Sequence, residues 1–185
     1  MTVLPLLSPQ SKLKGKPEMP SFVCTAAALA GLALAGCASA PPPSRSAPDL
    51  YASLARPGAR VDPAAARDVI SIYRNNKGLP VLRLDPALQR IAERQVRSMA
   101  THGGADRAVR SGLRRQLASE KVSYRTAVQN VSSGYHTLPE AFAGWRQSKP
   151  HNANMLNRNV KRMGIASAYV PGTKYRVHWA LVLAD

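Results

Sequence analysis

The stretch from residue 163 to residue 183 limits the fold more than any other part of the sequence. Met163, Ile165 and Ser167 alternate with small residues, and the segment Pro171–Thr173 then provides a Pro-Gly turn. A second alternating run follows, and one of its faces is apolar or aromatic: Tyr175, Val177, Trp179, Leu181 and Leu183. Alternation with a period of two on both sides of a turn predicts an antiparallel β-hairpin. Such a hairpin has to bury its apolar face against a second layer of structure.

Helical patterns come before this hairpin. Asp62-Pro63 and Asp85-Pro86 each place an acidic N-cap before a proline at the first helical position. Apolar residues follow at helical spacing in both segments: Ala66, Val69, Ile70 and Tyr73 in the first, and Leu88, Ile91, Ala92, Val96 and Met99 in the second. Arg90, Arg94 and Arg97 fall mostly outside the second stripe. Two amphipathic helices are therefore predicted.

Three weaker elements lie between these helices and the hairpin. The pattern predicts a short helix over residues 111–120 and a strand with a turn over 126–135. Thr137 is a suitable N-cap for a further helix that contains Phe142 and Trp145. Helices first and an antiparallel hairpin last predict an α+β domain built in layers.

The first 37 residues have the composition of an export signal. Lysines at positions 12, 14 and 16 precede an apolar run, rich in alanine and glycine, that ends at Cys37. The run is too short to cross a bilayer, so it indicates a signal peptide. "LAGC" (34–37) resembles a bacterial lipobox, whose cysteine becomes lipidated and anchors the protein, and the absence of a following aspartate favours the outer membrane. The alternative is an ordinary signal peptide cut after Ala40.

Residues 38–60 are rich in proline, serine and alanine, and we expect them to form a disordered tether. The domain itself is then predicted over residues 61–185, with a start near Tyr51 as the alternative. Because Cys24 lies inside the signal and Cys37 would carry the lipid, the mature domain is expected to contain no disulfide bond.

The chain is strongly basic, with a formal net charge of +16. For a cytosolic protein this charge would suggest nucleic acid, whereas for an exported protein it suggests anionic lipid head groups or envelope glycans. No basic cluster is interleaved with aromatic residues, so we expect no nucleic-acid partner. The other explanation is a basic surface that is merely solvated.

Five motifs in sequence order resemble the CAP superfamily, the cysteine-rich secretory, antigen 5 and pathogenesis-related group, in its bacterial branch. They cover residues 78–100, 127–135 ("AVQNVSSGY"), 138–145, 151–157 ("HNANMLN") and 163–182. The resemblance implies an α-β-α sandwich, which agrees with the elements predicted from the residues themselves.

The resemblance also implies a cleft with two histidines and two acids, which binds a divalent metal in some members. Carried over to this sequence, the second histidine is His151 and the second acid is Glu140. Gln129 stands in place of the first acid and Arg107 in place of the first histidine, while His102 comes several residues too early. An amide lacks the required negative charge and an arginine repels a cation, so we expect Arg107 to pair with Glu140 and no metal or other cofactor to bind.

The polar residues also have structural explanations. Thr137 and Glu140 have the spacing of a capping box. His151 could bond a neighbouring backbone group, and His136 and His178 have no partner pattern. Asparagines are expected to satisfy buried backbone groups around the cleft: Asn130, Asn152 and Asn154.

Three functions remain open at this point. The first is a lipid-anchored, non-enzymatic CAP domain that binds a lipid, glycan or protein. The second is a metal-assisted hydrolase or peptidase using His151 and Glu140, or a serine hydrolase, for which Ser132 and Ser133 show no evident acid–base partners. The third is a basic domain that tethers envelope polyanions. Arg107 and Gln129 argue against the enzyme, and the sequence does not choose between the first and the third function.

Overall fold

The computed structural model describes residues 49–102 and 112–185. The elements run in the order α1 (Pro63–Asn75), β1 (Arg83–Leu84), α2 (Pro86–His102), α4 (Leu113–Ser119), β2 (Ala127–Ser133), α5 (Leu138–Gln147), α6 (Lys149–Met155), β3 (Arg162–Tyr169) and β4 (Val177–Ala184). Cys37 and Arg107 lie outside the described residues. Within the described residues, no helix is both long and apolar enough to span a membrane.

One four-stranded sheet forms the middle of the domain, with the strand order β1-β3-β4-β2. Strand β4 is antiparallel to both β3 and β2, and short β1 is parallel to β3. The predicted hairpin is thus confirmed as β3 and β4. Tyr175 was expected on the apolar face of the second strand, but it precedes β4 and is 45% exposed. The connection is longer than the Pro-Gly turn, because the bond from Val170 N–H to Arg176 O closes it around Tyr175.

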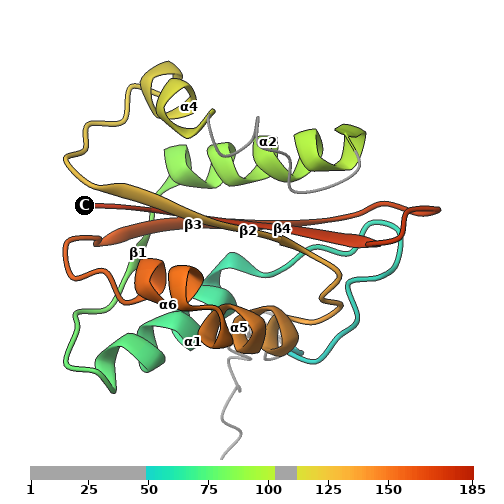
Figure 1. Ribbon diagram of the computed structural model, residues 1–185, viewed down its shortest axis with the longest axis horizontal. Coiled ribbons are helices and arrows are strands. Elements are labelled where there is room, and N and C mark those ends of the chain that lie inside the picture. The colour runs from blue at the N-terminus through green and yellow to red at the C-terminus, as the bar shows by residue number, and fades with distance from the viewer. Residues whose placement is uncertain (1–48, 103–111) are drawn as a thin grey trace, which may run out of the picture. The chain divides into compact units, whose positions relative to one another are not determined.

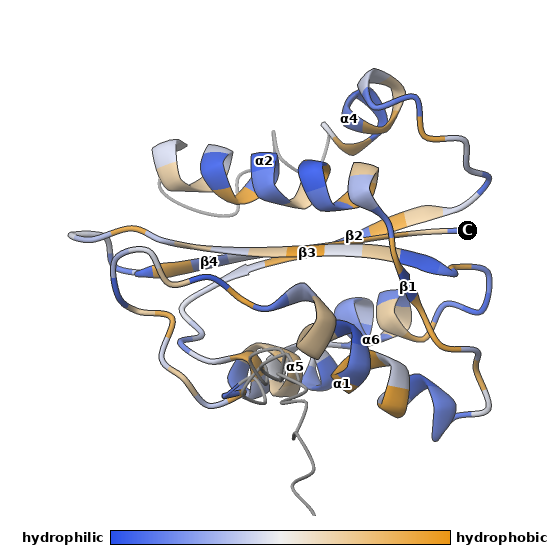
Figure 2. Ribbon diagram, turned by 180° about the vertical axis from the view of Figure 1, so that it is seen from behind, coloured by the Kyte–Doolittle hydropathy of each residue, from blue (hydrophilic) through white to orange (hydrophobic). Residues whose placement is uncertain are grey.

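Helices cover both faces of this sheet (Figure 1), which confirms the α+β sandwich. Helices α2 and α4 lie on one face, and α1, α5 and α6 lie on the other. Every residue of β4 is buried, because the side chains of this inner strand point into two core layers: Val177, Trp179, Leu181 and Leu183 into one, and Ala180, Val182 and Ala184 into the other. In Figure 2, hydrophobic residues of α2 face the sheet while much of its outer side is hydrophilic.

The N-caps predicted from the sequence fix the starts of the helices. Asp62 Oδ1 accepts from the Ala64 N–H at 2.8 Å. Asp85 Oδ1 accepts from the Ala87 and Leu88 N–H groups at 2.8 and 3.0 Å. The start of α2 also lies directly on β3, because a Cβ on Gly164 would come within 2.2 Å of the Gln89 nitrogen. Glycine is therefore required at position 164 for α2 to pack this closely.

Residues 49–62 form an ordered strap that runs over one side of the domain. Leu54 is 8% exposed and belongs to the core, and its N–H donates to His136 O at 2.7 Å. The tether boundary at residue 60 is therefore too late for these contacts, whereas the alternative start near Tyr51 fits them. The reason is that Leu50, Leu54 and Val61 supply apolar surface inside a segment of otherwise tether-like composition.

Candidate functional site

Two of the positions implied by the family resemblance come together at the outer edge of β2. Asn130 is fully buried, and its Nδ2 donates to His151 O at 3.0 Å. Asn154 Nδ2 donates to Gln129 O at 2.9 Å and to Asn130 Oδ1 at 3.0 Å. An edge strand presents main-chain groups that need partners, and α6 supplies them here. Asn130 and Asn154 thus have the structural role expected for them, and they join the segments that carry Gln129 and His151. Asn152 differs, since its Oδ1 accepts from the Tyr73 hydroxyl at 2.9 Å.

The Gln129 side chain belongs to a cluster of amides on the α2 side of the sheet. Gln95 is fully buried in α2, and its Nε2 donates to Gln129 Oε1 at 2.7 Å and to Gln116 Oε1 at 3.0 Å. The Gln95 Oε1 has no hydrogen-bond partner within the described part of the chain. The cluster therefore joins α2, α4 and β2. The sequence contained one signal for this buried cluster: Gln95 lies between Ala92 and Met99 on the apolar face of α2.

Glu140 is engaged at the start of α5. Its Oε2 accepts from the His136 N–H at 2.8 Å, while Thr137 Oγ1 accepts from the Glu140 N–H at 3.3 Å. These two bonds satisfy free N–H groups at the helix start, as in a capping box, although the glutamate reaches one residue further back than expected. The predicted partner of Glu140, Arg107, lies outside the described residues.

The described residues do not fit a divalent metal. An amide stands at position 129, and the Glu140 carboxylate already accepts a main-chain hydrogen bond. Over residues 49–102 and 112–185, no three histidine, cysteine, aspartate or glutamate side chains lie together as a metal site. Zinc and similar ions take imidazole, thiolate and carboxylate ligands, and a neutral amide cluster does not provide these.

Ser133 and His178, for which the sequence showed no evident acid–base partner and no partner pattern, form a pair in the structure. Ser133 lies opposite His178 in the sheet register, and its Oγ is 2.7 Å from His178 Nδ1. Ser132 Oγ accepts from Trp145 Nε1 at 3.1 Å. The Ser133–His178 pair was missed because it depends on the register of two strands distant in sequence, and only the hairpin of β3 and β4 was visible as a pattern.

The Ser133–His178 pair has a structural role. His178 is 1% exposed, and burial lowers the pKa of its imidazole, so the ring is neutral at neutral pH. Nucleophilic serines need a base whose second nitrogen is oriented by a third group. His178 Nε2 has no such partner among the residues that the structure describes. A serine hydrolase is therefore not supported by this pair.

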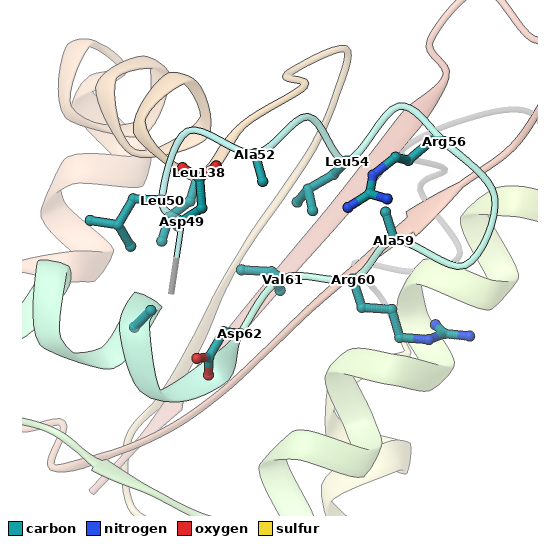
Figure 3. Close-up of a pocket in the computed structure, with 11 residues that line it drawn as sticks. Asp49, Leu50, Ala52, Leu54, Arg56, Ala59, Arg60, Val61, Asp62 and Leu138 are labelled. Carbon is teal, nitrogen blue, oxygen red and sulfur yellow. The ribbon is translucent and has the colours of Figure 1, made fainter. Parts of the chain in front are cut away.

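A separate cavity of about 210 Å³, here called the strap pocket, lies beneath the strap. Its apolar wall comes from the strap, the first turn of α1 and the start of α5: Leu50, Leu54, Val61, Ala65 and Leu138. Asp49, Asp62 and Arg56 also line it, and Arg60 extends from the strap toward α2 (Figure 3). Sequence reasoning missed this pocket because it assigned most of the strap to the disordered tether.

Comparisons with known proteins agree with this architecture. The model of the cysteine-rich secretory protein family, CAP, matches residues 67–183. The uncharacterized protein YkwD of Bacillus subtilis is 28% identical over 100 residues, which are 53% of this chain and 39% of YkwD.

Solved structures are similar as well. A cysteine-rich secretory protein from Staphylococcus aureus aligns with a TM-score of 0.55 and 24% identity, over 66% of this chain and 37% of that one. An extracellular SCP-domain protein from Bacillus anthracis aligns with a TM-score of 0.57 and 20% identity, over 66% of this chain and 40% of that one. An outer surface protein from Borrelia burgdorferi aligns with a TM-score of 0.57 and 14% identity, over 68% of this chain and 96% of that one. The chain thus spans about two fifths of the length of YkwD and of the first two structures, and these structures share its fold.

Proposed function

The chain belongs to the CAP family of cysteine-rich secretory proteins, and on this basis we propose that it is a non-catalytic binding domain of the cell envelope. In this proposal a lipid on Cys37 anchors the protein, and the strap pocket takes an apolar ligand such as an acyl chain. The extracellular and outer surface proteins among its structural relatives support an exported location.

The observation that carries the binding function is the composition of the strap pocket. Aliphatic side chains form its wall, while the carboxylates of Asp49 and Asp62 and the guanidinium of Arg56 lie at the same cavity. Ligand pockets are typically concave and mostly apolar, with a few polar groups that orient the ligand. An amphiphile matches this arrangement, because its chain removes apolar surface from water while its head group meets the charged residues.

The proposal that the domain is not catalytic rests on the groups at the positions of the family's two acids. The Gln129 amide is bonded to Gln95, and the Glu140 carboxylate accepts from the His136 N–H. Both groups therefore help to stabilise the fold, and the amide at position 129 cannot act as an acid or a base. The metal-assisted hydrolase is for this reason the less supported alternative.

Lipidation of Cys37 is tested by mass spectrometry of the mature protein from its host membranes. We expect a new N-terminal cysteine that carries acyl chains, and we expect Cys37→Ser to move the protein into the soluble fraction. An unmodified terminus at Pro41, the residue after "ASA", would contradict the anchor. The binding function would remain open to separate test.

Ligand binding is tested with laurate and the Cys37→Ser protein by isothermal titration calorimetry. Ala52 lines the strap pocket, so Ala52→Phe should fill part of it and weaken laurate binding by at least about tenfold. This value corresponds to the exclusion of about two methylene groups. Ala118→Phe adds the same ring on α4, at an exposed position that does not line the pocket, and should leave the affinity unchanged. Equal affinities for wild type and Ala52→Phe would contradict the proposed site.

A further inference from the structure

A second, polar binding site lies between the strap, α2 and β3, and we propose that it binds an acidic oligosaccharide through Arg60 and Arg97. The site consists of two adjoining cavities of about 390 and 360 Å³, and both arginines line both cavities. We call it the arginine groove. It goes beyond the apolar strap pocket, with which it shares residues 59–61 of the strap.

The floor of the groove is the outer edge of β3. Strand β1 pairs only with Arg162 and Met163, so beyond this point the edge of β3 that faces away from β4 has no strand partner among the described residues. Instead, Gln89 Oε1 accepts from the Ile165 N–H at 3.0 Å and Gln89 Nε2 donates to Ile165 O at 2.9 Å. Ser167 Oγ accepts from the Val61 N–H at 2.8 Å. Side chains therefore satisfy this edge and hold the strap at a distance that leaves the groove.

The two arginines of the groove have no partner among the described residues. On the same helix, Arg90 and Arg94 form ion pairs with Glu120. Within the described ranges, Arg60 and Arg97 make neither a hydrogen bond nor an ion pair. Figure 3 shows the Arg60 side chain extending from the strap toward α2, the helix that carries Arg97.

The groove also has an excess of positive charge. Glu93 is the one carboxylate among its described lining residues, and it accepts a hydrogen bond from Gln89 at 3.2 Å. Over its described lining, the groove therefore has two guanidinium groups and one carboxylate. Guanidinium groups bind the oxygens of carboxylates and phosphates in a bidentate manner.

The shape and lining of the groove favour a sugar chain as the carrier of these oxygens. Ser167, Thr101 and Gln89 are polar lining residues, and Tyr169 adds a half-buried aromatic ring. Pockets for polar ligands combine such hydrogen-bonding groups with an apolar surface. A flat bilayer cannot enter a concave groove, whereas a single acidic glycan strand can. The net charge of +16 would raise the rate at which such a polyanion arrives.

The test uses the full chain with Cys37→Ser and hexagalacturonate, with neutral maltohexaose, inorganic phosphate and phosphatidylglycerol vesicles as comparison ligands. We expect hexagalacturonate to bind and maltohexaose not to bind. Arg97→Gln and Arg60→Gln should each weaken hexagalacturonate binding by about tenfold or more, since each removes a charge-assisted contact. Inorganic phosphate should compete with hexagalacturonate at high concentration.

The control removes two arginine charges elsewhere, one more than each single variant of the groove. Arg114 and Arg115 are exposed on α4 and line neither cavity, so Arg114→Gln with Arg115→Gln should change the affinity by less than about twofold. If this control weakened hexagalacturonate binding as much as the groove variants do, the groove would be rejected as the site. Unspecific attraction between the basic protein and the polyanion would then explain the binding. Binding to vesicles without binding to hexagalacturonate would overturn the choice of ligand.

The inference rests on the proposed function only in treating the protein as a binding domain. Arg97 does not line the strap pocket, so Arg97→Gln should leave laurate binding unchanged. Failure of hexagalacturonate binding with intact laurate binding would reject the arginine groove alone. The converse result would reject the strap pocket alone.

Discussion

Replacing Arg74 with methionine is expected to lower the free energy of unfolding by about 3–5 kcal/mol, the range for removing one partner of a buried charged contact. Arg74 is fully buried near the end of α1. Its guanidinium donates to four main-chain carbonyls, those of Pro80, Met155, Asn157 and Val160, at 3.0, 2.7, 2.9 and 3.2 Å. It thereby joins the end of α6 to the segments that follow α1 and α6.

The expected loss of stability in Arg74→Met follows from the carbonyls that Arg74 binds. Burial lowers the pKa of Arg74, but a guanidinium remains protonated in a folded protein, so the charge is held in the interior by its hydrogen bonds. Methionine fills similar space and donates nothing, which leaves buried acceptors unsatisfied at about 1–3 kcal/mol each. The position beside the C-terminal end of α6 adds a favourable interaction with the helix dipole, which the neutral side chain also loses.

Urea unfolding of wild type and variants measures this effect. Lys77→Met removes a cation from an exposed position just after the same helix and should change stability by less than about 0.5 kcal/mol. Arg74→Lys should fall between the two, because one ammonium cannot reach all the carbonyls that the guanidinium fork reaches. An Arg74→Met protein within about 1 kcal/mol of wild type would contradict the structural role of this contact.

The elements with local signals were predictable from the sequence. Asp62 and Asp85 cap helices as expected, Thr137 caps α5, and the alternation before and after the Pro-Gly turn gives β3 and β4. Trp145, expected in the core, is fully buried. Each of these features depends on residues close together in the chain, so periodicity and capping patterns reveal them.

Contacts between distant segments were not predictable in this way. Arg74 had no local signal of burial, because the carbonyls of Met155 and Val160 that it binds lie more than eighty residues further along the chain. Gln95 and His178 find their partners only through the packing of α2 and the register of β2 on β4. The strap was hidden because a few apolar residues in a tether-like sequence do not show which surface they will cover.

The candidate site was partly predictable through the family motifs. These motifs selected His151, Glu140 and Gln129, and in the structure Asn130 and Asn154 join α6, which carries His151, to β2, which carries Gln129. The amide cluster around Gln129 and the bond from Glu140 to His136 required the structure. The strap pocket and the arginine groove lie outside the motifs' predicted cleft, so no family motif pointed to them.

The central claim, that this domain binds ligands without a metal centre, is tested by restoring the family ligands. Arg107→His with Gln129→Glu supplies two imidazoles and two carboxylates together with His151 and Glu140. A glutamate at position 129 can still accept the bond from Gln95 Nε2, so the amide cluster keeps that contact. The first substitution removes a positive charge and the second adds a negative one, so the net charge of the site becomes more negative by two. In water, each of these changes favours binding of a dication about 4 Å away by at least about 2 kcal/mol.

Calorimetric titration with zinc should therefore compare wild type, the double revertant, and the revertant carrying His151→Ala. We expect no zinc binding at micromolar concentrations by the wild type, affinity at least about a hundredfold higher in the revertant, and loss of that gain with His151→Ala. Tight zinc binding by the wild type that His151→Ala abolishes would contradict the account and favour the metal-assisted hydrolase.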